Sequence, residues 1–146
     1  MSYFECLNGY LSEFGKKWNL GELAFDGEDM ATIASGDVFV NLHWREAICT
    51  LVVWAPVGVP ADEEALRVWR EALKANLHGR RTDGFSLALA TGGEIDGRVL
   101  VLQDHREAEF FDCYESFESY IASLIRTVGV WRGQLVTPPA CELISV

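Results

Sequence analysis

The sequence is poor in basic residues and lacks any long uninterrupted apolar run. Twelve Lys and Arg face 22 Asp and Glu, so the formal net charge of the 146-residue chain is −10 at pH 7. Nucleic-acid affinity rests on Lys and Arg side chains that displace counterions from phosphates, so we expect no nucleic-acid partner. The longest apolar stretch, Ala47–Ala61, contains two prolines and is shorter than the roughly 20 residues of a membrane-spanning helix. We therefore expect no membrane span.

Cysteine motifs and a basic N-terminal segment are also missing. The four cysteines are too far apart for a C-x-x-C pair, and no His lies at metal-ligand spacing from them. We expect reduced thiols, no metal and no cofactor, as suits a cytoplasmic protein. No Lys or Arg precedes the first apolar residues, which predicts that there is no secretory signal peptide.

The composition is that of one folded domain. Hydrophobic residues make up 49% of the chain and charged residues 23%, far from the composition of disordered chains. A chain of this length buries a core without needing disulfides and is too short for two ordinary domains. We expect residues 1–136 to form the domain and residues 137–146, which begin Thr-Pro-Pro, to form a flexible C-terminal tail.

Apolar residues recur every three or four positions in three segments, a spacing that predicts helices. The predicted helices span Tyr3–Trp18, about Glu63–Leu77 and about Cys113–Leu135. Asn19 and Gly21 are expected to end the first helix, because both tolerate a left-handed cap. Asp62 is expected to cap the second.

Segments rich in Val, Ile, Phe, Trp and Thr predict five strands. They are Met30–Ser35, Val38–Trp44, Ala47–Ala55, Phe85–Thr91 and Arg98–Gln103. Pro56 and Pro60 are expected to bracket a turn, the glycines at 92, 93 and 97 to form a hairpin connection, and Asp104–Glu109 to form a charged link. The fold class is therefore α+β: a compact single domain with the order helix, three strands, helix, two strands, helix, its helices packed on a twisted antiparallel sheet.

The sequence contains no recognisable catalytic motif. His43, His78 and His105 are scattered, and none has a carboxylate or cysteine partner at metal spacing. Asp104, His105 and Arg106 are adjacent on the predicted link, but no nucleophile motif accompanies them. We therefore expect that the chain is not an enzyme.

The aromatic content is high for a chain of this size, with five Trp, eight Phe and four Tyr. One interpretation places all of these residues in a monomeric core. The other pairs Trp69, Leu73, Leu87 and Leu89 with their copies in a second chain. The first helix offers a similar choice between the core and an exposed groove.

Three segments contain short motifs. Ala75–Gly84 has the form of a helix that ends in Ala-Asn, then a polar stretch and a T-x-G turn, and the predicted strand Phe85–Ala90 follows it. Asn19–Asp26 contains L-x-x-L-x-F-D, and Val130–Leu135 contains W-x-x-x-L. In their order and spacing these segments resemble those of class I type III secretion chaperones, the Tir chaperone (CesT) family. The resemblance covers about residues 3–136. Asp83, where the family often has Gly, departs from the pattern.

The resemblance implies a cytoplasmic homodimer without ATPase activity. It would hold the N-terminal chaperone-binding segment of a secreted effector extended, soluble and secretion-competent, and deliver it to the export apparatus, with the secretion ATPase as a further partner. The effector-binding residues that it implies are Leu11, Phe14, Trp18, Phe25, Ile33, Val40 and Leu42. The dimer-interface residues that it implies are Leu66, Trp69, Leu73, Leu87 and Leu89.

Two other functions stay open at this point. A dimer of the same fold could sequester a secretion or transcription regulator instead of an effector. A hot-dog-like thioesterase would need a dominant helix early in the chain, whereas the longest helix predicted here is the last. A homodimer would carry twice the charge of the chain, which favours solubility and a client segment with basic residues.

Overall fold

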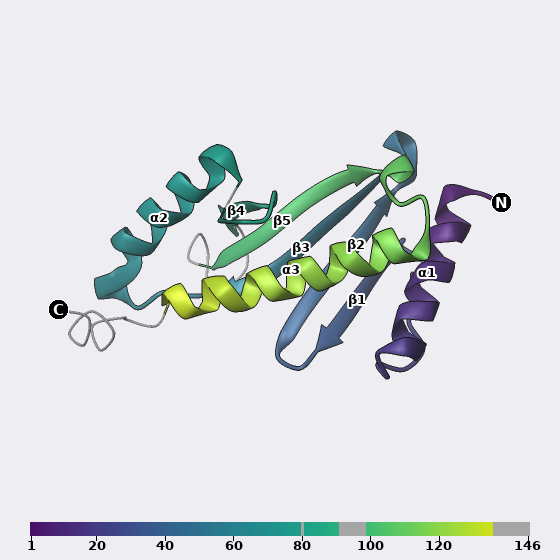
Figure 1. Cartoon of the computed structure of the whole chain (residues 1–146), viewed down its shortest axis with the longest axis horizontal. Helices are drawn as coiled ribbons and strands as arrows, with labels where there is room; N and C mark the ends of the chain where they lie inside the picture. The colour runs from purple at the N-terminus through teal and green to yellow at the C-terminus, as the bar shows by residue number, and fades with distance from the viewer. Residues whose placement is uncertain (80, 91–98, 136–146) are drawn as a thin grey trace.

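Five antiparallel strands form one twisted sheet, and three helices pack along it (Figure 1). The computed structural model describes residues 1–79, 81–90 and 99–135. The helices are α1 (Tyr3–Lys17), α2 (Ala65–His78) and α3 (Tyr114–Leu135). The strands are β1 (Met30–Ser35), β2 (Val38–Arg45), β3 (Thr50–Gly58), β4 (Ser86–Leu89) and β5 (Leu100–Glu107). Short 3-10 turns precede β3, α2 and α3.

The strands lie in the order β1-β2-β3-β5-β4, so β1 and β4 are the two edges of the sheet. Every neighbouring pair is antiparallel. A tight turn joins β1 to β2, where Ser35 pairs with Val38 and Gly36 has a positive φ of 62°. Such a φ is readily adopted only by glycine and a few polar residues.

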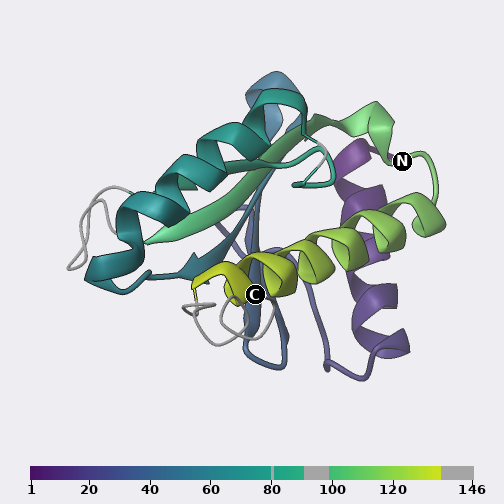
Figure 2. The ribbon, with the colours of Figure 1, turned by 60° about the vertical axis from the view of Figure 1, so that its left-hand side comes forward.

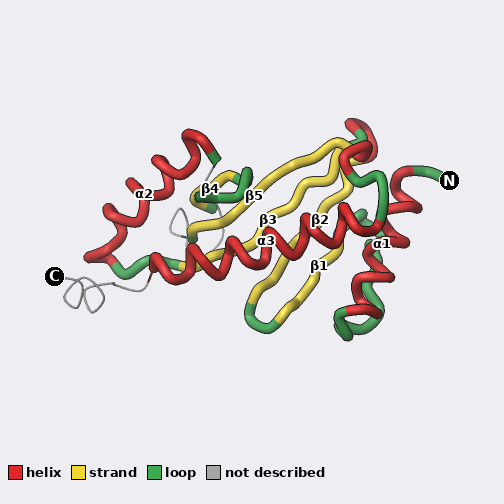
Figure 3. The backbone as a smooth tube through the Cα atoms, viewed as in Figure 1, coloured by secondary structure: helices red, strands yellow, loops and turns green. Residues whose placement is uncertain are grey.

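Helices α1 and α3 lie on one face of the sheet, and α2 flanks its β4 edge. Helix α3 lies across β2 and β3, α1 packs on α3, and α2 lies beside β4 (Figures 2 and 3). Along β2 the residues Val38, Val40, Leu42 and Trp44 are buried, whereas Phe39 between them is exposed. This alternation places the core between the sheet and α3 and leaves the opposite face of β2 open.

Much of the predicted architecture is confirmed. The first and last helices begin and end within one residue of their predicted bounds, and the first three strands form an antiparallel meander. The element order and the α+β class also agree. The predicted glycine hairpin and the predicted C-terminal tail lie outside the described residues.

The prediction for the third strand is wrong at both ends. A 3-10 turn at Glu46–Ile48 and a left-handed Cys49 come before it, so the strand begins at Thr50 rather than Ala47. Pro56 does not begin a turn but pairs with Val101 inside the strand. An irregularity in the register between Pro56 and Gly58 accommodates the missing N–H.

The predicted charged link after residue 103 is also wrong, because β5 continues to Glu107. Residues 104–107 pair with residues 50–53 of β3. Their charges are compatible with a strand because Asp104 and Arg106 form an ion pair of 2.6 Å on the helix side of the sheet. His105, between them in sequence, is exposed.

The start of the second helix differs as well. Asp62 begins a 3-10 turn, and the α-helix starts three residues later at Ala65. The residue at the N-cap position is Glu64, and no side chain forms a capping hydrogen bond there. The prediction that Asp62 caps the helix is therefore wrong.

Asn76 attaches α2 to the edge of the sheet. Its side-chain amide donates to the Leu87 carbonyl and accepts from the Leu87 N–H, both at 2.8 Å. These two bonds satisfy main-chain groups that β4 turns away from β5. The amide thereby closes the outer edge of β4 at Leu87 and sets the position of the helix.

Replacing Asn76 with Ala should lower the free energy of unfolding by about 2 kcal/mol, because it leaves the N–H and C=O of Leu87 without partners. Urea denaturation followed by circular dichroism at one protein concentration measures this change. The matched control is Lys74→Ala on the exposed side of α2, which should change stability by less than about 0.5 kcal/mol. Equal stability of the two variants would show that the amide contact is dispensable.

Candidate functional site

The seven residues implied in effector binding divide into two groups. Five have side chains in the hydrophobic core: Leu11, Phe14, Ile33, Val40 and Leu42. The structure thus turns these five side chains toward the core, and their part in effector binding stays a prediction. Trp18 is 49% exposed and Phe25 is half-buried. These two side chains reach the surface, and Phe14 also lines the pocket described next.

Trp18 forms one wall of an apolar pocket of about 200 Å³ between α1 and α3. Its ring stacks on Phe14 with centroids 5.6 Å apart. Leu20 from the following loop and Ala122 and Ile125 from α3 complete the apolar lining. We call this cavity the Trp18 pocket. Its size suits one aliphatic side chain of a bound segment.

A close contact between α1 and its following loop shapes this pocket. A Cβ at Gly15 would lie 2.4 Å from the Gly21 carbonyl oxygen, so only glycine allows the loop to return so tightly. The predicted helix end is confirmed, because Asn19 and Gly21 both have positive φ values, 57° and 86°. The Leu20 N–H then bonds the Gly15 carbonyl at 2.8 Å.

Glu118 on α3 holds Trp18 over the pocket. Its carboxylate accepts from the Trp18 indole N–H and from the Lys17 ammonium, each at 3.0 Å. The Tyr114 hydroxyl donates to it at 3.1 Å. These donors, Lys17 foremost, lower the pKa of Glu118 below its usual 4.5. Burial and the Glu118 carboxylate raise the pKa of Tyr114 to about 12, so the hydroxyl stays a donor.

The outer edge of β1 lies open next to this region. Met30 turns its main chain outward, since its carbonyl accepts from the Asp26 N–H at 2.8 Å and its N–H donates to the Asp26 carboxylate at 3.0 Å. Main-chain direction alternates along an antiparallel strand, so Thr32 and Ala34 face outward too. Among the described residues, none bonds their main chains on that side. An extended chain can therefore add to the sheet here.

The residues implied in dimerisation lie on α2 and β4. Leu66 and Leu73 are 60% and 72% exposed, and Leu77, one helical turn further on, is 76% exposed. We call these three residues the leucine stripe; they share one face of α2, opposite the buried Val68, Ala72 and Ala75. Leu89 is also exposed and Trp69 is half-buried.

Leu87 is different, because its side chain is buried in the core. The strand turns it toward the helices, and its contact with a second chain stays a prediction. Leu77 and Leu20 were not among the implied site residues. The i, i+4 spacing from Leu73 to Leu77 was the available signal for the first, whereas nothing local marks Leu20.

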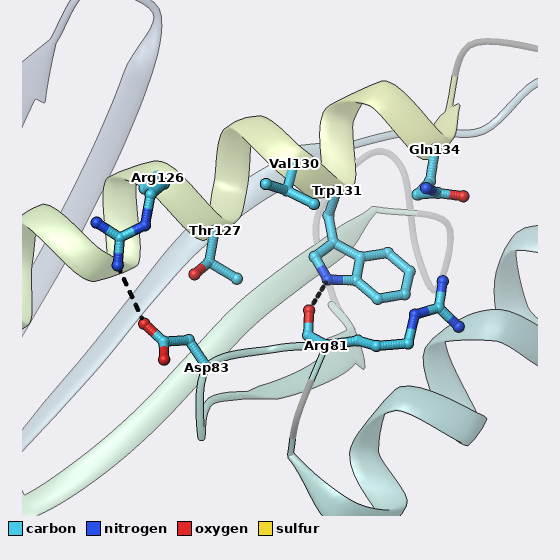
Figure 4. Close-up of a pocket in the computed structure, with 7 residues that line it drawn as sticks. All are labelled: Arg81, Asp83, Arg126, Thr127, Val130, Trp131 and Gln134. Carbon is cyan, nitrogen blue, oxygen red and sulfur yellow. Dashed lines mark hydrogen bonds and ion pairs between the residues drawn. The ribbon is translucent and has the colours of Figure 1, made fainter.

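A larger and more polar pocket, of about 410 Å³, lies between α3 and the loop that precedes β4 (Figure 4). The Trp131 indole N–H donates to the Arg81 carbonyl at 2.8 Å, and the Arg81 guanidinium lies over the Trp131 ring. Arg126 pairs with Asp83 at 3.3 Å across the pocket. Each charge that lines it already has an opposite charge nearby, because Arg81 also pairs with Glu71 at 2.6 Å.

The three adjacent polar residues of β5, Asp104, His105 and Arg106, do not face a common site. Asp104 and Arg106 point toward α3, where the Tyr120 hydroxyl donates to Asp104 at 2.9 Å, whereas His105 lies on the other face. Burial, reinforced by the Asp104 charge, raises the pKa of Tyr120. Within the described ranges, no three His, Cys, Asp or Glu side chains are grouped to hold a metal ion. No helix in that part of the chain is both long and apolar enough to span a membrane.

Comparison with known proteins gives a consistent result. The model of the Tir chaperone protein (CesT) family matches residues 9–132. A chain of the ExsC–ExsE complex shares 25% identity and a TM-score of 0.72, with 92% of this chain and 97% of that chain covered. No curated protein sequence matches this chain.

Two further solved structures share the fold. One is the HopA1–SchA chaperone–effector complex, with a TM-score of 0.64 and 16% identity over 87% of this chain and 93% of that chain. The other is the Yersinia pestis type III secretion chaperone SycH with a fragment of YscM2, with a TM-score of 0.63 and 15% identity over 89% of this chain and 99% of that chain.

Changing Glu118 to Gln should cost at most about 1 kcal/mol of stability at pH 7. A carboxylate whose pKa is lowered by folding contributes stability above its unfolded pKa, and that contribution is lost as the pH falls through the folded pKa. The difference between wild type and variant should therefore shrink below about pH 4.5. Urea unfolding at a series of pH values tests this, with the exposed Glu109→Gln as control. A difference that is independent of pH would contradict it.

Proposed function

The chain belongs to the Tir chaperone protein (CesT) family, and from this premise we propose that it is a type III secretion chaperone. It binds the N-terminal segment of a secreted effector, here called the client, keeps that segment extended and soluble, and delivers it to the export apparatus. It works as a homodimer in the bacterial cytoplasm and catalyses no reaction. The family match over residues 9–132 carries this proposal.

The surface around the Trp18 pocket supports the client-binding part of the proposal. Ordering one residue of an extended chain costs about 1–2 kcal/mol, whereas burying a large apolar side chain returns about 1.5–3 kcal/mol. A client segment therefore needs several apolar anchors and main-chain hydrogen bonds. The Trp18 pocket offers an anchor point, and the open edge of β1 offers main-chain partners.

The leucine stripe of α2 supports the homodimer. The three leucines are each more than half exposed and lie on one face of one helix. In a monomer they would form a contiguous apolar patch in contact with water, which is unusual. Leu89 extends the same apolar character to the edge strand that α2 contacts. Pairing with a second copy would bury both elements.

Purification of the tagged protein from its native host, followed by mass spectrometry, tests the function. A secreted effector bound through its N-terminal segment is the expected result. A secretion or transcription regulator in its place would favour the regulatory alternative. The absence of any stoichiometric protein partner would overturn the proposal.

Trp18→Asp should weaken client binding by about 10- to 100-fold, since it removes one apolar anchor and adds a charge. The side chain lies at the surface, so the fold and the oligomeric state should be retained. Titration of the purified client and light scattering measure the two properties. Tyr3→Asp, at the other end of α1 and similarly exposed, is the matched control and should leave binding unchanged. Equal affinity of the two variants would remove Trp18 from the site.

Leu73→Glu should convert the dimer to a folded monomer, because it places a charge at the centre of the leucine stripe. Sedimentation velocity reports the mass and circular dichroism the fold. The control is Ile48→Glu, at another apolar position that is more than half exposed, in the turn before β3, and this variant should remain dimeric. If Leu73→Glu is still a dimer, the interface lies elsewhere; if the wild type is monomeric, the homodimer is wrong.

A further inference from the structure

The guanidinium of Arg106 is held in one orientation on β5. Its Nε atom donates to Asp104 at 2.6 Å, and the same carboxylate accepts from the Tyr120 hydroxyl at 2.9 Å. The planar group lies 4.7 Å from the centroid of the Phe110 ring and 5.9 Å from that of Tyr120. The Tyr120 hydroxyl is the other polar group close to the guanidinium, so within the described part of the chain its terminal N–H groups are not all engaged. A preorganised donor of this kind loses little entropy on binding.

A pocket of about 360 Å³ opens beside this group. Phe85 and Tyr120 are the buried part of its lining, and Phe110, which is 46% exposed, stands at its border. We call this cavity the Arg106 pocket. It combines free N–H donors with an exposed aromatic face.

The charges around the pocket favour a neutral acceptor. Arg106 is already paired with Asp104, and Asp83 at the border is paired with Arg126. An additional carboxylate would meet these two acidic groups, and an ammonium group would meet Arg106 itself. A main-chain carbonyl accepts from the Nη atoms without adding charge.

We propose that Arg106 binds a main-chain carbonyl of the client, next to an apolar client side chain that packs on Phe110. This inference rests on the proposed chaperone function and deepens it. It adds a second anchor point on the flank of α3 away from the Trp18 pocket. The ligand is an extended, uncharged stretch of polypeptide.

The surface between the two pockets supports a single continuous client segment. Ala122 lines the Trp18 pocket, whereas Ser119 and Ser123 line the Arg106 pocket, so small side chains of α3 connect the two. The ion pair of Arg126, which lines the first pocket, with Asp83, which lines the second, borders this surface. A helix is about 10 Å across, and an extended chain advances about 3.3 Å per residue. About three or four client residues should therefore separate the residue in the Trp18 pocket from the residue at Arg106.

Site-specific photo-crosslinking in the native host tests this path. The residue p-benzoylphenylalanine replaces Phe110, Trp18 or, as a control at an exposed apolar position on another surface, Ile48. The expected result is that the probes at positions 110 and 18 crosslink to the same polypeptide. The two crosslinked client positions should lie within about ten residues of each other, because the client crosses the width of one helix between the pockets. Ile48 should not crosslink to that segment.

Affinity measurements with the client so identified test the role of Arg106. Arg106→Lys keeps the positive charge but loses the planar guanidinium with its several N–H donors, and it should weaken client binding by about tenfold or more. Arg45→Lys, at an exposed arginine at the end of β2, should not. Phe110→Ala leaves the Asp104 ion pair intact and should also weaken binding, which keeps the test valid if Arg106→Lys unfolds.

The outcomes separate this inference from the proposed function. Crosslinking at Trp18 but not at Phe110, or unchanged affinity in both variants, would overturn the Arg106 site and leave the chaperone function standing. Crosslinking at neither position, together with the absence of a client, would overturn the function itself.

Discussion

A pair of hydrogen bonds between the Asn76 side chain and the main chain of Leu87 joins α2 to the edge of the sheet, alongside the core packing of Val68 and Ala72. Because an amide supplies one donor and one acceptor, it serves as a short piece of an additional strand. It satisfies the edge of β4 at Leu87 and orients the helix so that Val68 and Ala72 point inward. The leucine stripe then has no place in the protomer and faces outward. The surface proposed for dimerisation thus follows from a polar contact.

The two edges of the sheet consequently have different properties. Asn76 blocks β4 at its centre, whereas the outward main-chain groups of Thr32 and Ala34 on β1 stay open. An open edge and exposed leucines are both liabilities for aggregation. The net charge of −10 counters them, because copies of the chain repel one another. A client-binding protein needs this balance, since its apolar sites must stay accessible before the client arrives.

Sequence reasoning succeeded where structure is local. Helical periodicity located α1 and α3, and alternating apolar residues located the β1–β3 meander. It failed at Pro56, where the local preference favours a turn, and at Asp104–Glu107, where the charges favour an irregular link. Both segments are parts of strands. At Pro56, a strand irregularity and the Arg132 guanidinium, which donates to the Pro56 and Val57 carbonyls, override the local preference. The Asp104 carboxylate accepts hydrogen bonds from Arg106 and Tyr120. Because Tyr120 is distant in sequence, no local pattern indicates this contact.

The sequence by itself determined the α+β class, the order of the elements and the family, because periodicity and short motifs are properties of neighbouring residues. Only the tertiary structure decided which apolar residues form the core and which form the surface. Phe14 in the last turn of α1 and Trp18 at its C-cap stack on each other, yet α3 covers the first and leaves the second half exposed. On α2 the structure buries the smaller residues and exposes the leucines. Periodicity shows which side chains share a face, but burial depends on what packs against that face, and that partner comes from elsewhere in the chain.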